Sequence, residues 1–331
     1  MQKIPINGKM KESDERKEPD MAEISIKEIN ELARLSPEEM IAEAERDYEK
    51  KVRQVADRVC EDENISLVLL AGPSGSGKTT TANLVADEIR RRGEEALVMS
   101  LDDFYRDQDD PDYPRLENGE RDYERPEALN LENLHEALSH IVSGKSFDMP
   151  KYDFKLGRRV STKTHPPIGH GCVIIEGLHS LNPRISDSLP KEKLLKLFVS
   201  VSTNINHEGE RILSGRKLRF IRRLVRDYIY RGATLERTLA MWSGVLAAED
   251  IFLYPYKYTA DLAFNTFHTF EPGVMKKFVI ELIPEALAER DPYLGTVLRA
   301  IKMAVPIDYH KIPNTSLIRE FIPGGIYENL Y

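Results

Sequence analysis

Cysteine is scarce in this chain of 331 residues, because only Cys60 and Cys172 are present. Two cysteines cannot form a disulfide framework, so the class of small disulfide-rich secreted proteins is excluded. The chain also has no run of about 18 apolar residues, which a membrane-spanning helix requires. Its charged N-terminus lacks the apolar segment of a signal peptide. We therefore expect a protein of the reducing cytoplasm with no membrane partner.

The chain also lacks an excess of basic charge. It has 47 lysines and arginines and 55 aspartates and glutamates, which gives a formal net charge of −8. This balance excludes a generic nucleic-acid binder. Residues 211–231 reverse it locally with eight basic residues and one aspartate, or +7, which leaves −15 for the rest of the chain. A basic segment in an acidic protein indicates a specific anionic ligand, so nucleic acid is not the expected partner.

The chain is long enough for two domains of ordinary size, and its hydrophobic content of 41% supports a large core. Residues 1–20 hold five basic and five acidic residues with little apolar material, so we expect a disordered lead. Residues 21–63 are predicted to form a helical N-terminal extension. Its main helix is expected to begin with Ser36 as N-cap, Pro37 in the first turn and Glu39 closing a capping box.

Short apolar runs then alternate with helical stretches, which is typical of a mostly parallel sheet covered by helices on both faces. We predict an α/β core over residues 64–270 with a five-stranded sheet. The extension over residues 271–331 is expected to be partly helical and partly irregular, because it contains segments with proline and glycine. The predicted strands are residues 67–70, 96–101, 172–175, 195–201 and 260–264, and the helices expected to serve as crossovers or lid are residues 130–142, 218–230 and 235–248.

Residues 72–79 read GPSGSGKT and fit the phosphate-binding pattern G-x-x-x-x-G-K-[ST], directly after an apolar strand. Glycines let such a loop curl until successive N–H groups converge on a phosphate, and the positive end of the following helix adds to the attraction. Lys78 is expected to reach the β- and γ-phosphate oxygens, and Thr79 to bind Mg²⁺. The pattern thus predicts a nucleoside triphosphate site. Its expected binding residues are Gly72, Pro73, Ser74, Gly75, Ser76, Gly77, Lys78, Thr79 and Thr80.

Carboxylates follow two further predicted strands. Glu176 ends the strand at residues 172–175, and Asp102 and Asp103 follow the strand at residues 96–101. In α/β proteins the carboxyl ends of parallel strands face the ligand. A carboxylate such as Glu176 can hold Mg²⁺ or its water shell, and one of the aspartates can accept the proton of an attacking hydroxyl. For the two aspartates, a solvated acidic turn remains the alternative.

Within the basic segment, Arg219, Arg222, Arg223 and Arg226 recur at the spacing of one helix face. Apolar residues occupy the opposite side, so we expect the arginines to face away from the packed side. Guanidinium groups suit phosphate oxygens, whose charge they neutralise during phosphoryl transfer. An ordinary surface helix carries acidic partners for its basic residues, but this segment has a single aspartate. The shortage of acidic partners favours contact of the arginines with phosphate. A solvated basic face and an RNA-binding stripe remain alternatives.

The order and content of these motifs resemble the uridine kinase and phosphoribulokinase family of P-loop kinases. The resemblance runs over residues 66–264, and residues 316–321 (SLIREF) are similar to the bacterial nucleoside kinase-like branch. It implies a P-loop NTPase fold with a helical lid at about residues 205–232. The matching segments are residues 72–79, SLDDFY at 100–105, DYERPEA at 122–128, PKYDF at 150–154, IEG at 175–177 and RRLVRD at 222–227, followed by Arg231 and Gly232.

The resemblance also implies a kinase that uses ATP and Mg²⁺ to phosphorylate a hydroxyl of a small nucleoside-like acceptor. By this match Asp102 is the catalytic base and Glu176 the Mg²⁺-associated acid. Glu124 would hold hydroxyls of the acceptor sugar, and Tyr105 and Tyr152 would line the acceptor pocket. The remaining implied contacts with the phosphoryl group or substrate come from Lys78, Arg223, Arg226 and Arg231.

Two positions depart from the family pattern. Gly157 stands where animal-type uridine-cytidine kinases place a base-reading histidine, and Ala233 stands where they carry an arginine. A pocket discriminates strongly through the polar groups that bind a base, so the identity of the acceptor stays open. Another nucleoside, a sugar phosphate, a pantothenate-like alcohol and a polyol remain alternatives.

The remaining alternatives concern class, metal and assembly. An ATP-binding regulator or RNA-associated protein is the alternative from another class. The chain has no Asn-Lys-x-Asp segment, which disfavours a GTP switch, whereas the preference between ATP and GTP as donor and a homo-oligomeric state are left open. His165, His170 and His179 match no usual zinc spacing, so no transition metal is expected. Trp242 is predicted to be a packing residue.

Overall fold

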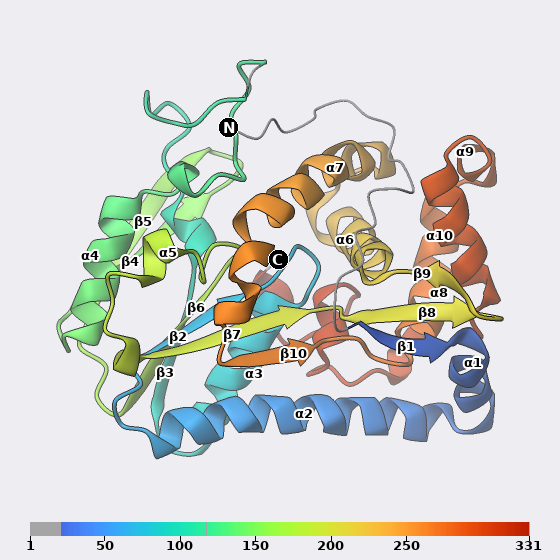
Figure 1. Cartoon of the computed structure of the whole chain (residues 1–331), viewed down its shortest axis with the longest axis horizontal. Coiled ribbons are helices and arrows are strands. Elements are labelled where there is room, and N and C mark those ends of the chain that lie inside the picture. The colour runs from blue at the N-terminus through green and yellow to red at the C-terminus, as the bar shows by residue number, and fades with distance from the viewer. Residues whose placement is uncertain (1–20, 117, 331) are drawn as a thin grey trace.

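The computed structural model describes residues 21–116 and 118–330, so the predicted disordered lead lies outside the described residues. At its centre is a five-stranded parallel sheet in the order β10-β7-β2-β6-β3 (Figure 1), which confirms the predicted fold class. The strands are β2 (Leu67–Ala71), β3 (Glu95–Ser100), β6 (Gly171–Glu176), β7 (Leu194–Ser200) and β10 (Leu262–Asn265).

Alternate side chains of the strands enter two apolar cores, one on each face of the sheet. In β2, the odd-numbered residues join the core that contains α4 (Leu131–Val142), and the even-numbered residues join the core that contains α2 (Pro37–Glu61) and α3 (Lys78–Arg91). Every residue of β2 is fully buried. Because both faces are covered, the strand is a continuous apolar run rather than an alternating one, as the sequence indicated.

The N-terminal extension begins with β1 (Ala22–Ser25) and α1 (Ile26–Leu35), and α2 then lies along the lower side of the sheet in Figure 1. A capping box starts α1. Ser25 Oγ accepts from the Lys27 N–H at 3.1 Å, and the Glu28 carboxylate accepts from the Ser25 N–H at 3.1 Å. These two bonds satisfy backbone donors that the first helical turn leaves without partners.

The predicted capping box at Ser36 is wrong. Ser36 does precede α2, but its side chain makes no capping hydrogen bond. The same residue also ends α1, where its N–H donates to the Leu32 carbonyl at 3.0 Å. Its backbone, at φ −154° and ψ 68°, therefore departs from the extended geometry with which an N-cap side chain reaches the following amides.

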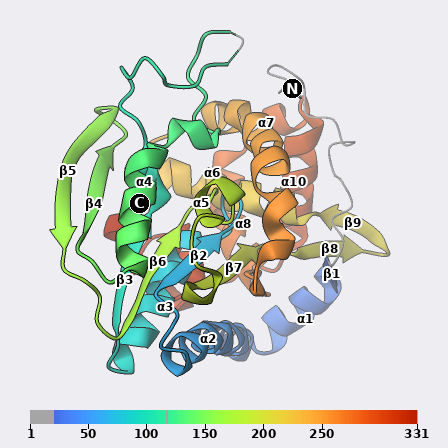
Figure 2. The ribbon, with the colours of Figure 1, turned by 60° about the vertical axis from the view of Figure 1, so that its left-hand side comes forward.

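Two small antiparallel pairings lie outside the main sheet and were not predicted. β8 (Thr203–His207) pairs with β9 (Glu210–Leu213) and, in parallel, with β1. β4 (Phe147–Asp153) and β5 (Arg158–His165) form a hairpin that lies beside α4 (Figure 2). Most of β5 is exposed, so its sequence lacks the apolar alternation from which a half-buried strand is recognised.

The second half of the chain supplies long helices that pack on one another. α6 (Gly215–Arg231) packs against α7 (Leu235–Phe252) and α8 (Glu271–Leu282), and α8 packs against α10 (Pro292–Met303). Trp242 is fully buried, which confirms its packing role. No helix among the described residues has both the length and the apolar content for a membrane crossing. The shorter helices are α5 (Pro183–Ser186), α9 (Glu285–Ala288), η2 (Leu101–Phe104), η3 (Pro126–Ala128), η4 (Lys191–Lys193), η5 (Tyr254–Thr259), η6 (Tyr309–Lys311), η7 (Leu317–Glu320) and η8 (Glu328–Leu330).

The segment after α10, which we call the tail (residues 304–330), is irregular apart from three short turns. It is nonetheless well packed. The guanidinium of Arg319 donates to the carbonyls of Pro313, Tyr309, Ile312 and Pro323, which fixes the path of the segment. Four of its apolar side chains are fully buried: Leu317, Ile318, Phe321 and Ile322.

Glu45 of α2 lies against the tail near Ser316, and burial raises the pKa of its carboxyl to about 7. In the unfolded chain this carboxyl titrates near its ordinary pKa of 4.5, so the folded state binds the proton more tightly between pH 4.5 and 7. The free energy of unfolding therefore falls as pH rises through this window. We expect Glu45→Gln to raise it by about 1–2 kcal/mol at pH 8, after allowing for solvent screening of a half-buried group.

Urea unfolding at pH 8 and pH 4 checks this prediction, because both forms of residue 45 are neutral at the lower pH. The exposed Glu43→Gln on the same helix is the matched control, for which we expect no change at either pH. An equal gain at both pH values would show that the carboxyl charge is not the cause.

Candidate active site

The loop at residues 72–77 joins β2 to α3 and leaves two glycines in the left-handed region. Gly75 has φ +74° and Gly77 has φ +89°. A Cβ at Gly75 would lie 2.7 Å from the Arg219 carbonyl oxygen, so both conformation and space require glycine there. The loop is closed by a hydrogen bond of 3.2 Å from the Ser76 N–H to the Pro73 carbonyl. This loop conformation directs the backbone N–H groups at the start of α3 toward a common position that suits an anion.

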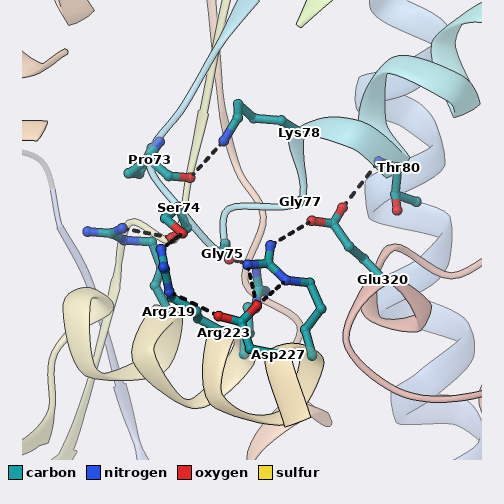
Figure 3. A network of polar contacts seen from close by, with 12 residues as sticks. Pro73, Ser74, Gly75, Gly77, Lys78, Thr80, Arg219, Arg223, Asp227 and Glu320 are labelled. Carbon is teal, nitrogen blue, oxygen red and sulfur yellow. Dashed lines mark hydrogen bonds and ion pairs between the residues drawn. The ribbon is translucent and has the colours of Figure 1, made fainter. Parts of the chain in front are cut away.

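Lys78 is the first residue of α3, and its side chain turns back over the loop. Its Nζ donates to the Pro73 carbonyl at 3.2 Å (Figure 3). Thr79 follows it, and Asn83 Nδ2 fixes the backbone one turn along by donating to the Thr79 carbonyl at 2.8 Å. The ammonium group and the positive end of α3 thus lie together at the carboxyl end of β2.

The arginines of α6 clamp the loop from outside. Arg219 Nη1 donates to the Ser74 carbonyl at 2.8 Å, and Arg223 Nη1 donates to Ser74 Oγ at 2.8 Å (Figure 3). Arg222 Nη1 donates to the Gly75 carbonyl at 3.2 Å. All three residues are buried. The prediction that the arginine face points away from packed protein is therefore wrong.

The prediction that these arginines lack acidic partners is wrong as well. Arg219 forms a bidentate ion pair with Glu249 of α7, and Arg222 forms one with Glu271 of α8. These glutamates lie 30 and 49 residues further along the chain, so a pattern within one helix cannot reveal them. Arg223, Arg226 and Arg231 surround Asp227 instead, with nitrogen–oxygen distances of 3.3, 2.8 and 3.3 Å.

Two predicted carboxylates meet at the ends of adjacent strands. β3 and β6 pair with Ser100 opposite Glu176, and Ser100 Oγ donates to Glu176 Oε1 at 2.8 Å. Burial raises the pKa of Glu176 to about 7, and the nearby Lys78 ammonium partly opposes that shift. Asp102 lies in η2, two residues after the end of β3. Solvent reaches it through the cleft, but the surrounding protein desolvates it and raises its pKa, again against Lys78.

The opposite wall of the site is aromatic. Tyr105 lies 5.9 Å from Tyr152 and 5.6 Å from Phe154 between ring centroids, and its hydroxyl donates to the Tyr123 carbonyl at 2.8 Å. The β4–β5 hairpin supplies Tyr152, and a bond of 3.2 Å from the Tyr152 N–H to Asp103 Oδ1 ties it to η2. The second predicted aspartate thus holds the hairpin in place.

Glu124 lies between this wall and α6. Burial raises the pKa of its carboxyl to about 7, and Arg223 opposes the shift. A half-buried carboxylate with a nearby guanidinium and aromatic faces can accept hydrogen bonds from hydroxyl groups of a small polar ligand.

One open cleft of about 2050 Å³ contains most of the predicted site residues. The P-loop, Asp102 and the aromatic residues all contribute to this cleft. Gly72, Pro73, Ser76, Gly77 and Thr80 are not among the residues that line the cleft. Those that do line it are Ser74, Gly75, Lys78, Thr79, Asp102, Tyr105, Glu124, Tyr152, Glu176, Arg223, Arg226 and Arg231.

Sequence reasoning missed two glutamates of this cleft. Glu249 Oε1 accepts from the Ser74 N–H at 2.8 Å, and Glu320 Oε2 accepts from the Thr80 N–H at 3.2 Å. Glu249 lies in a mixed helix with no motif around it. Glu320 lies in the segment SLIREF, whose resemblance to the bacterial nucleoside kinase-like branch gives no sign of its contact with the loop.

Gly157 lies in the turn between β4 and β5 with φ +66°. A Cβ there would approach Gln108 Cδ to 2.4 Å. Any side chain at this position would thus need both a strained backbone and a shifted Gln108. The local geometry therefore favours glycine at the position where the animal-type pattern has a histidine.

The oxygen donors of Thr79 and Glu176 are of the hard type that Mg²⁺ prefers. Among the described residues no cluster of three or more His, Cys, Asp or Glu side chains is arranged to hold a metal ion. The site therefore fits a Mg²⁺ ion whose other ligands are water and nucleotide phosphates rather than a cage of protein ligands.

Comparison with known proteins agrees with this geometry. The model of the phosphoribulokinase / uridine kinase family matches residues 67–271, which is more than half of the chain. The chain belongs to this family. It is a small-molecule kinase of the P-loop type.

Similar curated proteins share its core. The uridine kinase of Deinococcus deserti is 32% identical over 195 residues, covering 58% of this chain and 84% of the relative. The uridine kinase of Halobacterium salinarum is 29% identical over 195 residues, covering 58% and 76%. Among solved structures, D-glycerate 3-kinase from Cryptococcus neoformans aligns with a TM-score of 0.44 and 17% identity, covering 61% of this chain and 88% of that one.

Proposed function

We propose that this kinase transfers the γ-phosphoryl group of ATP, with Mg²⁺, to a hydroxyl of a small nucleoside-like acceptor. One observation supports this proposal above the others. A single cleft brings the P-loop, the carboxylates of Asp102 and Glu176, and the aromatic wall with Glu124 together. A donor site and an acceptor site on facing walls are what direct transfer between two bound molecules needs.

On the donor side, the amides of the P-loop and Lys78 hold the phosphates. Thr79 and Glu176 hold Mg²⁺ or its water, and the ion neutralises charge on the phosphate oxygens. Arg223 and Arg226 project from α6 into the same cleft and balance the charge that develops on the transferred group. These roles account for the cationic lining of this side.

On the acceptor side, Asp102 accepts the proton of the attacking hydroxyl as the new oxygen–phosphorus bond forms and ADP leaves. Desolvation raises its pKa, which brings a carboxylate closer to the strength that a general base needs near neutral pH. Glu124 accepts hydrogen bonds from neighbouring hydroxyls, while Tyr105 and Tyr152 offer faces to a planar group. Arg231, at the end of α6, borders the same space.

A nucleoside is the favoured acceptor because the curated relatives with the stated similarity are uridine kinases and because an aromatic wall suits a base. A sugar phosphate, pantothenate-like alcohol or polyol remains the second candidate, since Gly157 offers no side chain to read a base. The RNA-associated alternative loses support, because Arg219 and Arg222 are buried in ion pairs and cannot form an exposed stripe.

Acceptor-dependent ADP release with Mg-ATP tests the proposal across uridine, cytidine, other nucleosides, ribulose 5-phosphate, pantothenate and simple polyols. We expect stimulation by one or a few nucleosides. Stimulation by a non-nucleoside alone would keep the chemistry and replace the acceptor. If no acceptor stimulates the purified protein although it binds ATP, the proposed reaction is wrong.

A further inference from the structure

The tail reaches the back of the P-loop and closes it. Leu317 packs so tightly on Gly77 that a Cβ there would lie 2.7 Å from Leu317 Cδ1. Leu317 is fully buried, and the turn η7 contacts α3. The donor site is therefore completed by a segment that lies about 240 residues away in the chain.

Glu320, at the end of that turn, places a carboxylate at the phosphate loop. Its Oε2 accepts from the Thr80 N–H at 3.2 Å (Figure 3). Its Oε1 lies 4.0 Å from Arg226 Nη1. The side chain is 4% exposed yet borders the cleft. Thr80 is the third residue of α3, so its N–H is one of the donors that an anion at the helix start would use.

The Glu320 carboxylate is thus a negative charge at a position that would otherwise suit a phosphate group. A phosphate group that approached the same end of α3 would meet that charge at short range in a buried setting, where screening by solvent is weak. Because the Thr80 backbone offers a single N–H donor, a carboxylate and a phosphate compete for it.

We propose that Glu320 competes with the donor phosphates for the start of α3, so that nucleotide binding displaces its carboxylate from Thr80. This inference rests on the proposed function of the P-loop as the ATP site. Arg226 gives the displaced group a destination, because a small rotation of the Glu320 side chain would shorten the existing 4.0 Å ion pair into a hydrogen-bonded one. Glu320 thus limits the affinity of the enzyme for its donor and for ADP.

Glu320→Gln tests the proposal, because glutamine keeps the shape of the side chain and removes the charge. We expect Mg-ADP and Mg-ATP to bind on the order of ten-fold more tightly than to the wild type, by titration calorimetry on the full chain. ADP release, followed by stopped flow, should slow by a similar factor. Glu289→Gln is the matched control, because this exposed position of the C-terminal extension makes no side-chain hydrogen bond or ion pair among the described residues.

The outcomes separate the two proposals. Unchanged or weaker binding in Glu320→Gln, with wild-type binding intact, would overturn the competition and leave the kinase assignment standing. Absence of nucleotide binding in the wild type would overturn both. If Glu320→Gln does not fold, as judged by its thermal transition, Glu320→Asp takes its place. The shorter acid retreats from the Thr80 N–H, so tighter binding is again expected and unchanged binding again overturns the proposal.

Discussion

Replacing Asp102 with asparagine should lower kcat by about 10²- to 10⁴-fold, the usual contribution of a positioned acid or base. Asparagine keeps the size of the side chain but cannot accept the hydroxyl proton. The loss should appear in kcat rather than in nucleotide affinity, because Asp102 lies beyond the end of β3 and outside the P-loop. The measurement is acceptor-dependent ADP release, with Mg-ADP binding followed by calorimetry in parallel.

Asp103→Asn is the matched control for this variant. Asp103 is the adjacent carboxylate, but its oxygens are engaged with Lys151 Nζ at 3.1 Å and with the Tyr152 N–H at 3.2 Å. We expect it to alter acceptor KM by less than about ten-fold and to leave kcat nearly unchanged. A wild-type kcat in Asp102→Asn, or an equal loss in both variants, would remove Asp102 from the role of base.

Arg222→Met should lower the free energy of unfolding by about 3–5 kcal/mol, because it leaves the Glu271 carboxylate buried and without its partner. The pair is almost fully buried, with nitrogen–oxygen distances of 2.6 and 2.7 Å. The same guanidinium donates to the carbonyls of Thr266 and Gly75, so the variant also loosens the P-loop from α6. Urea unfolding and the affinity for Mg-ADP measure the two effects separately.

The double variant Arg222→Met/Glu271→Leu separates charge burial from packing. Replacing both charges with apolar groups should recover most of the lost stability, whereas the nucleotide affinity should stay low because the contact with Gly75 is still missing. Arg34→Met, at an exposed position of α1, should have no effect on either quantity. If the single variant loses less than 1 kcal/mol, as a solvent-exposed pair would, the buried pair contributes little to stability.

The buried parts of the fold were predictable because their signals are local. The apolar runs that became β2, β3, β6, β7 and β10 stand out against their flanks, and two-sided burial made the central runs β2, β6 and β7 continuous. The P-loop was predictable because its function needs glycine at set positions, and Gly75 and Gly77 do adopt positive φ. The β5 strand was not predicted, because its residues are exposed and the alternating pattern that marks a strand is missing.

The role of the arginine helix could not be predicted in the same way. Spacing within α6 correctly placed Arg219, Arg222, Arg223 and Arg226 on neighbouring turns, but not the fate of each guanidinium. Two of them are used to bind buried glutamates on α7 and α8, and the other two pair around Asp227 next to the cleft. The periodicity of a sequence shows which residues share one face of a helix. It does not show which other elements cover that face, and those neighbours decide whether the face is buried.

The sequence by itself determined the kinase class, the parallel sheet and the phosphate loop, because the signals for each, apolar runs and short motifs, span only a few neighbouring positions. Only the tertiary structure decided which carboxylates serve that loop. Glu249 and Glu320 reach it from 175 and 240 residues away, so their contacts exist only after α7 and the tail have packed against α6 and α3. The physical reason is that a buried charge needs a partner nearby in space, and folding rather than chain order provides that partner.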